Sequence, residues 1–331
     1  MEVEAGRRRS FVAMLAAAIA FAWMATGPAV AAEFPSRPVK FIVPLAAGSA
    51  TDILARQIAK SLESDWQQPV VVENRPGAGG IVAADFVSKQ PADGHTLLLT
   101  GSSLVIAPLI DRNATFRLDK DLTPVARLAV LRVVLATNTS VPAGTLQEFA
   151  ALSHANAGKM NYAGLGRTSI IDIGIEVLKR GLQMDVSPVT YRGAAEHNVA
   201  LIRNDVQLVW GGAMVLREQA ATGKVKILAV VSDRRFPDLP DVPTVVEAGH
   251  SGFIPRVWTG LIAPAATPSN IQEQINRDVN RVLARPDVAR LLQDRLGNDP
   301  APLPSGAFAE EVRKESRFWA DMFKELNIQP Q

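Results

Sequence analysis

Short apolar runs rich in β-branched residues alternate with helix-forming stretches along most of this chain, and this alternation restricts the fold more than any other feature. The clearest unit begins with the run 39–43 and leads, through a loop of small residues, into a predicted helix over 51–62. In that helix Leu54, Ile58 and Leu62 recur at a spacing that places them on one face. Repeated units of this kind predict an α/β fold whose mainly parallel sheets are flanked by helices.

Two series of such units follow one another, and the length of the chain also favours two lobes. The chain has 331 residues, and single hydrophobic cores commonly divide near this size. The closing helices alternate poorly with strands, so we expect them to pack back onto the first lobe. The predicted division is 33–136 with 256–331 as the first lobe and 137–255 as the second. Two hinge crossings are then expected, near Ala136 and Pro255.

The first 32 residues have the layout of a secretory signal. Three consecutive arginines, Arg7–Arg9, precede an apolar run from Phe11 to Ala25, and small residues follow. The run is shorter than the roughly 20 residues that a membrane-spanning helix needs. We therefore expect residues 1–32 to be removed on export to the periplasm. Because Arg8–Phe11 also resembles a twin-arginine signal, the Sec and Tat routes both stay open.

Cysteine and charge content exclude several classes of protein. The chain has no cysteine, so it can form no disulfide and cannot carry the lipid-bearing cysteine of many tethered exported proteins. With 35 basic and 33 acidic residues the net charge is only +2, which gives no reason to expect nucleic acid as a partner. No later run is apolar and long enough to span a bilayer. We expect a freely soluble monomer that is not embedded in a membrane.

Three loops rich in small residues stand where a predicted strand ends and a helix begins. These loops are Ala46–Thr51, Gly101–Ser103 and Gly164–Ser169. Open α/β sheets bind ligands at this position, and the free amides at a helix start attract an anion without a counter-charge. Hydroxyls add further donors, from Ser49, Thr51, Ser102, Ser103, Thr168 and Ser169. The loops predict a carboxylate site built mainly from backbone and hydroxyl groups, although glycine and serine are also ordinary turn and cap residues.

The sequence carries no motif for a cofactor or for catalysis. Gly164–Gly166 lacks the third glycine of a dinucleotide fingerprint, because Ser169 stands there, and neither a phosphate-binding loop nor a G-x-S-x-G elbow occurs. The histidines lack metal-ligand spacing and are expected at surface or turn positions. They are His95, His154, His197 and His250. We therefore expect no enzyme, no cofactor and no metal.

Several segments together resemble a known family, the Bug-type or TctC-like extracytoplasmic solute receptors of tripartite tricarboxylate transporters. In chain order the segments are VPLAAG at 43–48 with DILAR at 52–56, ENRPGAGG at 73–80, PADGHTLL at 91–98, VPT at 242–244 with Glu247 and Gly249, and LIAP at 261–264 with Thr267 and Pro268. The resemblance covers nearly the whole chain from Phe34. It implies a two-lobed, hinged periplasmic binding protein of type II-like fold, which captures a small organic carboxylate for the membrane subunits of such a transporter.

The resemblance also implies which loops hold the ligand. The first pincer is Leu45, Ala46, Ala47, Gly48, Ser49, Ala50 and Thr51, and the second is Gly166, Arg167, Thr168 and Ser169. The rest of the cleft is expected to be lined by Ser102, Ser103, Tyr191, Gly193, Gly211 and Gly212. Arg167 has two readings, since a loop guanidinium can grip a carboxylate with two parallel bonds or can simply be solvated.

The chain departs from the family pattern inside this cleft. Ser49 replaces a usual glycine, Asp172 a common histidine, and Gly211 a frequent acidic residue. Loss of an acid and gain of Arg167 make the cleft more positive, so we expect a plain or aromatic mono- or dicarboxylate and not an amino acid. The alternatives to a transport receptor are an orphan receptor that feeds a sensor or signalling partner, and an exported hydrolase assembled from distant residues.

Overall fold

The computed structural model describes residues 34–166, 169–250, 252, 254 and 256–325. The predicted leader, 1–32, lies outside these residues. The chain divides into an N-terminal unit that ends at Ser36 and a main unit that begins at Arg37. Everything described below belongs to the main unit.

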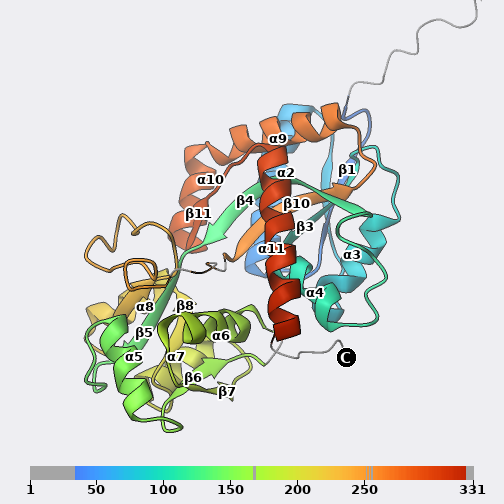
Figure 1. Cartoon of the computed structure of the whole chain (residues 1–331). Helices are drawn as coiled ribbons and strands as arrows, with labels where there is room; N and C mark the ends of the chain where they lie inside the picture. Colours follow the sequence, from blue (N-terminus) through green and yellow to red (C-terminus); the bar gives the residue numbers. More distant parts are fainter. Residues whose placement is uncertain (1–33, 167–168, 251, 253, 255, 326–331) are drawn as a thin grey trace, which may run out of the picture. The chain divides into compact units, whose positions relative to one another are not determined.

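A six-stranded mixed sheet carries the early and late parts of the main unit (Figure 1). In spatial order its strands are β11 (Asn298–Pro300), β4 (Leu122–Leu131), β10 (Trp258–Pro264), β3 (Thr96–Gly101), β1 (Val39–Val43) and β2 (Val70–Asn74). Strand β1 pairs in parallel with β2 and β3, whereas β10 runs antiparallel to β3 and β4. The strands that belong to strand–helix units are therefore the parallel ones.

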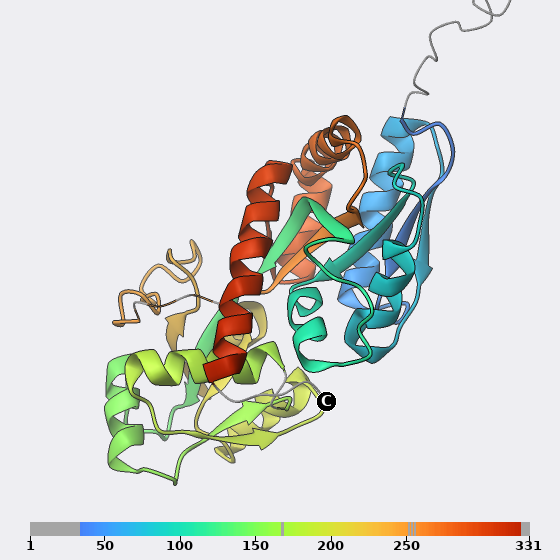
Figure 2. The same cartoon turned by 45° about the vertical axis from the view of Figure 1, so that its right-hand side comes forward.

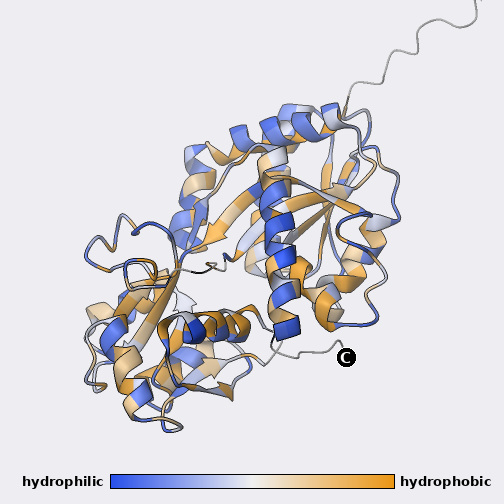
Figure 3. Cartoon of the chain, viewed as in Figure 1, coloured by the Kyte–Doolittle hydropathy of each residue, from blue (hydrophilic) through white to orange (hydrophobic). Residues whose placement is uncertain are grey.

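Helices cover this first sheet. They are α2 (Ala50–Trp66), α3 (Ile81–Ser88), α4 (Ser103–Ile110), α9 (Ser269–Leu283), α10 (Pro286–Arg290) and α11 (Ser305–Glu325), with the short turns η1 (Ala78–Gly80) and η2 (Leu291–Arg295). Helix α11 packs across β4, and α2 packs along α9 (Figure 2). In Figure 3 the strands are mostly apolar and the polar colours gather on helices such as α9 and α11.

Close packing of α11 on β10 depends on one glycine and one buried carboxyl. A Cβ on Gly260 would lie 2.7 Å from the ring of Phe308, so only glycine lets this ring reach the strand. Trp258 and Trp319 both donate indole N–H bonds to Glu315, at 2.6 and 3.1 Å. Burial raises the pKa of Glu315 to about 7 against the effect of these two bonds.

The middle of the chain forms a second group of strands. These are β5 (Val133–Asn138), β6 (Asn161–Gly164), β7 (Ser187–Thr190), β8 (Val209–Gly212) and β9 (Val225–Val230), joined by α5 (Leu146–Ala155), α6 (Ile170–Leu182), α7 (Ala194–Arg203) and α8 (Ala213–Ala221). Strand β5 runs antiparallel to both β8 and β9, β6 pairs in parallel with β7, and a single parallel bridge joins Tyr162 to Leu208. A separate core around Tyr162 and Trp210 fills this region.

The α/β class expected from the sequence is confirmed, but the sheets are not all mainly parallel. The six-stranded sheet is mixed, β8–β5–β9 is antiparallel, and the β6–β7 pair is parallel. Parallel neighbours need a long crossover, usually a helix. Only Arg132 separates β4 of the first sheet from β5 of the second group, so β5 enters its sheet without such a crossover.

The same pairing bears on the expected lobe boundaries, which stay a prediction. The division placed 133–136 in the first lobe, whereas these residues pair with β8 and β9. The change of sheet therefore favours a first crossing at Arg132. The second expected crossing, Pro255, lies outside the described residues.

Candidate functional site

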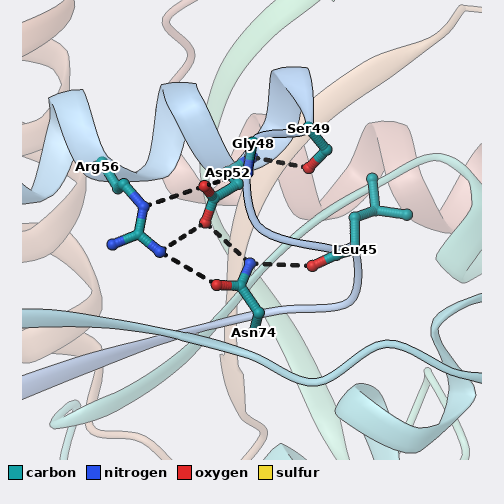
Figure 4. Close-up of polar contacts among 6 residues, drawn as sticks. All are labelled: Leu45, Gly48, Ser49, Asp52, Arg56 and Asn74. Carbon is teal, nitrogen blue, oxygen red and sulfur yellow. Dashed lines mark hydrogen bonds and ion pairs between the residues drawn. The ribbon is translucent and has the colours of Figure 1, made fainter.

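The first candidate loop joins β1 to α2 and is held to the helix start by a reciprocal cap (Figure 4). The Ser49 hydroxyl accepts from the Asp52 amide at 3.2 Å, and the Gly48 amide donates to the Asp52 carboxylate at 2.9 Å. Gly48 has φ +83°, a left-handed conformation that glycine adopts without penalty. Ser and Asp three residues apart thus satisfy two amides that the turn would leave open.

Asp52 also forms an ion pair with Arg56. Arg56 donates to both of its oxygens at 3.0 Å, and the Asn74 side-chain amide donates to Asp52 at 2.8 Å and to the Leu45 carbonyl at 2.9 Å (Figure 4). Burial of Asp52, which is 2% exposed, works to raise its pKa, but the bonds from Arg56, Gly48 and Asn74 outweigh burial and lower the pKa. The carboxylate therefore stays ionised and anchors the loop.

The second candidate loop, between β6 and α6, repeats the arrangement. The Ser169 hydroxyl accepts from the Asp172 amide at 3.1 Å, and the Leu165 amide donates to the Asp172 carboxylate at 2.7 Å. The Tyr162 hydroxyl donates to Asp172 at 3.3 Å, and burial together with the Asp172 charge raises the pKa of Tyr162, so this donor stays protonated. Among the described residues, no lysine or arginine forms an ion pair with Asp172.

Gly164 ends β6 beneath this carboxylate. A Cβ at this position would lie 2.2 Å from an oxygen of Asp172, so the buried carboxylate requires a glycine there. The Gly164 carbonyl accepts from the Tyr191 amide at 2.9 Å and faces His197 Nε2 at 3.1 Å. Because a carbonyl only accepts, Nε2 carries the proton.

His197 corrects an expectation drawn from the sequence. It lies in α7 and is 1% exposed, so it is neither a surface nor a turn residue. Burial lowers its pKa, partly offset by the bond to Gly164 and the charge of Asp172. The ring of Tyr191 meets it edge-on at 5.8 Å. His197 is therefore a neutral donor that supports the second loop, and its isolated position in the sequence gave no sign of this.

The first amides of three helices have no acceptor among the residues that the structure describes. In α2 these are Ala50 and Thr51, in α4 Ser103 and Leu104, and in α6 Ile170 and Ile171. None of them donates a hydrogen bond to another described residue. Such amides, at the positive end of a helix dipole, form an anion-binding site.

Two of these helix starts meet at one cavity of about 610 Å³. Ser103 opens α4 on one side of the cavity, and Leu165, Ser169 and Ile170 lead into α6 on the other. Ser103 and Ser169 were expected from the sequence to share a site, and the structure brings them together. The first loop, 45–51, is not among the residues that line this cavity.

The remaining predicted residues have diverse places. Ser102 is buried and its amide donates to the Trp258 carbonyl at 3.1 Å. Gly211 and Gly212 were expected in a loop, which is wrong, because β8 continues through them and pairs them with β5. Gly193 immediately precedes α7. Arg167 and Thr168 lie outside the described residues.

Most of the residues that line the cavity were not predicted from the sequence to belong to the site. These residues are Ala78, Gly79, Ile81, Ile106, Ala107, Ile110, Asp111 and Asn113. Four consecutive residues, 77–80, have positive φ, and their glycine-rich sequence was a signal that the backbone turns sharply there. A helix start after Gly101–Ser103 was predicted, but the extent of α4 was not, because its run SLVIAPLI is almost continuously apolar and contains Pro108, so it shows no helical period.

A second cavity, of about 340 Å³, lies at the change of sheet around Arg132. Its arginines are largely occupied, since Arg127 is held by Glu311 at 2.6 Å and Arg256 by Asp233 at 2.8 Å. Within the described part of the chain, no group of three or more His, Cys, Asp or Glu could hold a metal ion. We therefore take the helix-start cavity, whose amides have no described acceptor, as the candidate anion site.

Across the described residues, no helix is both long enough and apolar enough to cross a bilayer.

The fold and the cavity define the class of two-lobed α/β periplasmic binding proteins. The family model described as tripartite tricarboxylate transporter family receptor, TctC, matches residues 54–328, and the chain belongs to this family.

Three similar proteins illustrate the family. The protein BugT of Bordetella pertussis is 30% identical over 305 residues, which are 90% of this chain and 92% of BugT. The structure of MatC from Rhodopseudomonas palustris with bound malate has 34% identity and a TM-score of 0.67, covering 87% of this chain and 99% of MatC. An R. palustris protein solved with adipate has 27% identity and a TM-score of 0.72, covering 90% of this chain and all of its own.

Proposed function

We propose that this protein is exported to the periplasm with removal of residues 1–32, binds a small organic carboxylate between its two lobes, and delivers it to the membrane subunits of a tripartite tricarboxylate transporter. The observation that carries the proposal is that the starts of α4 and α6, with their free amides, border one cavity. The ligands of two relatives, malate and adipate, support the carboxylate class.

The carboxylate is received by the first amides of α4 and α6 and by the Ser103 hydroxyl, whereas the Ser169 hydroxyl lines the cavity but already donates its proton to Asp172. The resident carboxylates Asp52 and Asp172 bond the loop amides of Gly48 and Leu165. The helix amides beyond them are thereby left for the ligand. Loop 45–51, Arg167, Thr168 and the glycines at 193, 211 and 212 stay predicted contacts, to be reached when the lobes close.

In this proposal, the lobes close around the bound ligand. The main unit changes sheet at Arg132, and the lobes expected on either side are 33–136 with 256–331, and 137–255. A ligand that contacts both lobes stabilises the closed form. Exclusion of water then strengthens the few polar contacts, because charges interact more strongly in a lower dielectric.

Calorimetric titration of the mature chain, 33–331, with malate, adipate, benzoate, aspartate and glutamate tests the proposal, together with the rise in melting temperature that a ligand of the folded state produces. We expect at least one of the three acids without an amino group to bind. Failure of every acid to bind, or tight binding of aspartate or glutamate alone, would contradict it.

A matched set of variants separates the amide contact from side-chain effects. Ile170→Pro removes one free amide at the first position of α6, where proline is tolerated, and the preceding Ser169 already has the extended backbone that proline requires. Affinity for the bound acid should fall about tenfold, the value of one charge-assisted hydrogen bond. Ile170→Val and Ser269→Pro, at the first position of α9, should leave affinity unchanged. If Ile170→Pro binds the acid as tightly as the wild-type protein does, the start of α6 does not contact the ligand.

A further inference from the structure

One face of α4 forms a continuous wall of the cavity. Ser103, Ile106, Ala107 and Ile110 recur at i, i+3, i+4 and i+7, and all four line the cavity. At 1.5 Å per residue, the wall from Ser103 to Asp111, the residue that caps the end of α4, is about 12 Å long. Apart from its first hydroxyl, this wall is apolar.

The two ends of this wall have opposite polarity. Ser103 stands at the positive end of the helix dipole, whereas the negative end is capped by Asp111, which also lines the cavity. Asn113 donates to one oxygen of Asp111 through its backbone and side-chain amides, at 2.8 and 2.9 Å. These contacts hold the negative charge in place.

The described lining of the cavity contains no lysine, arginine or histidine. A second carboxylate at the far end would therefore meet a fixed negative charge and a helix C-terminus, and no described lining residue offers a cation to offset them. The wall opposite α4 adds further apolar surface, from Ile81, Leu165 and Ile170.

We infer that the preferred ligand is a monocarboxylate with an extended apolar body, and that a dicarboxylate of the same length is disfavoured. Its carboxylate lies at the starts of α4 and α6, and its body lies along Ile106, Ala107 and Ile110 toward Asp111. This inference rests on the proposed function and names the substrate class of the same site.

Hexanoate and adipate form a matched pair for the test, because they have the same number of carbons and differ in the second carboxylate. Calorimetry at pH 7.5 on the mature chain should give a Kd for hexanoate at least tenfold lower than that for adipate. Adipate binding as tightly as hexanoate, or more tightly, would overturn the inference and leave the carboxylate function intact. Failure of the wild-type protein to bind either these acids or the wider carboxylate panel would instead refute the proposed function.

A charge reversal identifies Asp111 as the source of the discrimination. Asp111→Lys places a cation at the far end, and we expect the ratio of adipate Kd to hexanoate Kd to fall at least tenfold. Asp321→Lys is the control for net charge, because Asp321 is 73% exposed on α11 and lies outside the cavity lining. A ratio that is unchanged in a folded Asp111→Lys variant, or that changes equally in the control, would overturn the assignment.

Discussion

The loop before α2 and the loop before α6 share the same helix cap but differ in the groups that stabilise the capping aspartate. In both, a serine caps the helix and an aspartate three residues later reaches back to a loop amide, in Ser49 with Asp52 and in Ser169 with Asp172. A side chain from elsewhere faces the carbonyl near the end of each strand, Asn74 at Leu45 and His197 at Gly164.

The difference lies in what surrounds each aspartate. Asp52 is paired with Arg56, whose side chain is 53% exposed, so the first loop depends on an ion pair open to solvent. Asp172 is bonded by neutral donors in a buried setting, above a glycine that leaves no room for a side chain. The same capping pattern can therefore depend on a partly exposed ion pair or on buried neutral donors, according to its neighbours.

The largest expected effect breaks the second loop and spares the first. Gly164→Ala places a Cβ against the Asp172 carboxylate and should lower the free energy of unfolding by about 3 kcal/mol, as overpacking of a buried site does. Gly48→Ala meets no atom within 4 Å and has only its positive φ to oppose, so about 1 kcal/mol is expected. Urea denaturation measures both, and equal losses would show that the loops do not differ in packing.

Removal of the buried carboxylate comes next. Asp172→Ala leaves the Leu165 amide and the Ser169 and Tyr162 hydroxyls without their acceptor, which should cost about 2 kcal/mol. Tyr162→Phe removes only one bond, of 3.3 Å, and should cost about 0.5 kcal/mol. A loss for Tyr162→Phe as large as that for Asp172→Ala would place the stabilisation in the tyrosine and not in the cap.

The pH dependence of stability separates the loops in a third way. Burial lowers the pKa of His197 below its ordinary 6.5, so the unfolded chain takes up the proton first. The stabilisation is complete above pH 6.5 and is lost as the pH falls through the folded-state pKa. The pKa of Asp52 is lowered from 3.8, so its stabilisation is fully present between pH 5 and 7 and is lost only at more acidic pH. Between pH 5 and 7, Glu315, whose pKa is raised to about 7, makes the free energy of unfolding fall with rising pH, and His197 makes it rise. In urea denaturation, His197→Gln should therefore make the free energy of unfolding rise less, or fall more, with pH than in the wild type, and Asp52→Asn should not; an unchanged pH dependence in His197→Gln would refute the assignment.

The smallest effect concerns the exposed ion pair. Arg56→Met should lower the free energy of unfolding by about 1 kcal/mol, because it takes two donors from the buried Asp52 carboxylate and leaves it with two amide donors; part of the loss should be screened in 1 M NaCl. Lys89→Met breaks an equally spaced pair with the more exposed Asp85 and, as the surface-pair control, should cost about 0.5 kcal/mol or less. A loss above 2 kcal/mol, independent of salt, would show that the first loop is as rigid as the second.

Much of the fold could be predicted from local patterns. The run 39–43 is β1 as expected, and the helix predicted over 51–62 is the inner part of α2. Strand β4 was missed, and of α4 only the start was predicted, because an almost fully apolar segment lacks the period that distinguishes helix from strand. The antiparallel setting of β5 could not be predicted either, since pairing is a long-range property.

By itself, the sequence determined the α/β class, the glycine and serine loops at three helix starts, and the family, because these depend on residues near one another along the chain. Tertiary structure alone decided that Ser103 and Ser169 share a cavity, that α4 presents an apolar wall ending at Asp111, and that His197 supports Gly164 from a distant helix. The physical reason is that caps and turns are made by neighbours in sequence, whereas a cavity and the charges facing it are made by segments that meet only when sheets and helices pack.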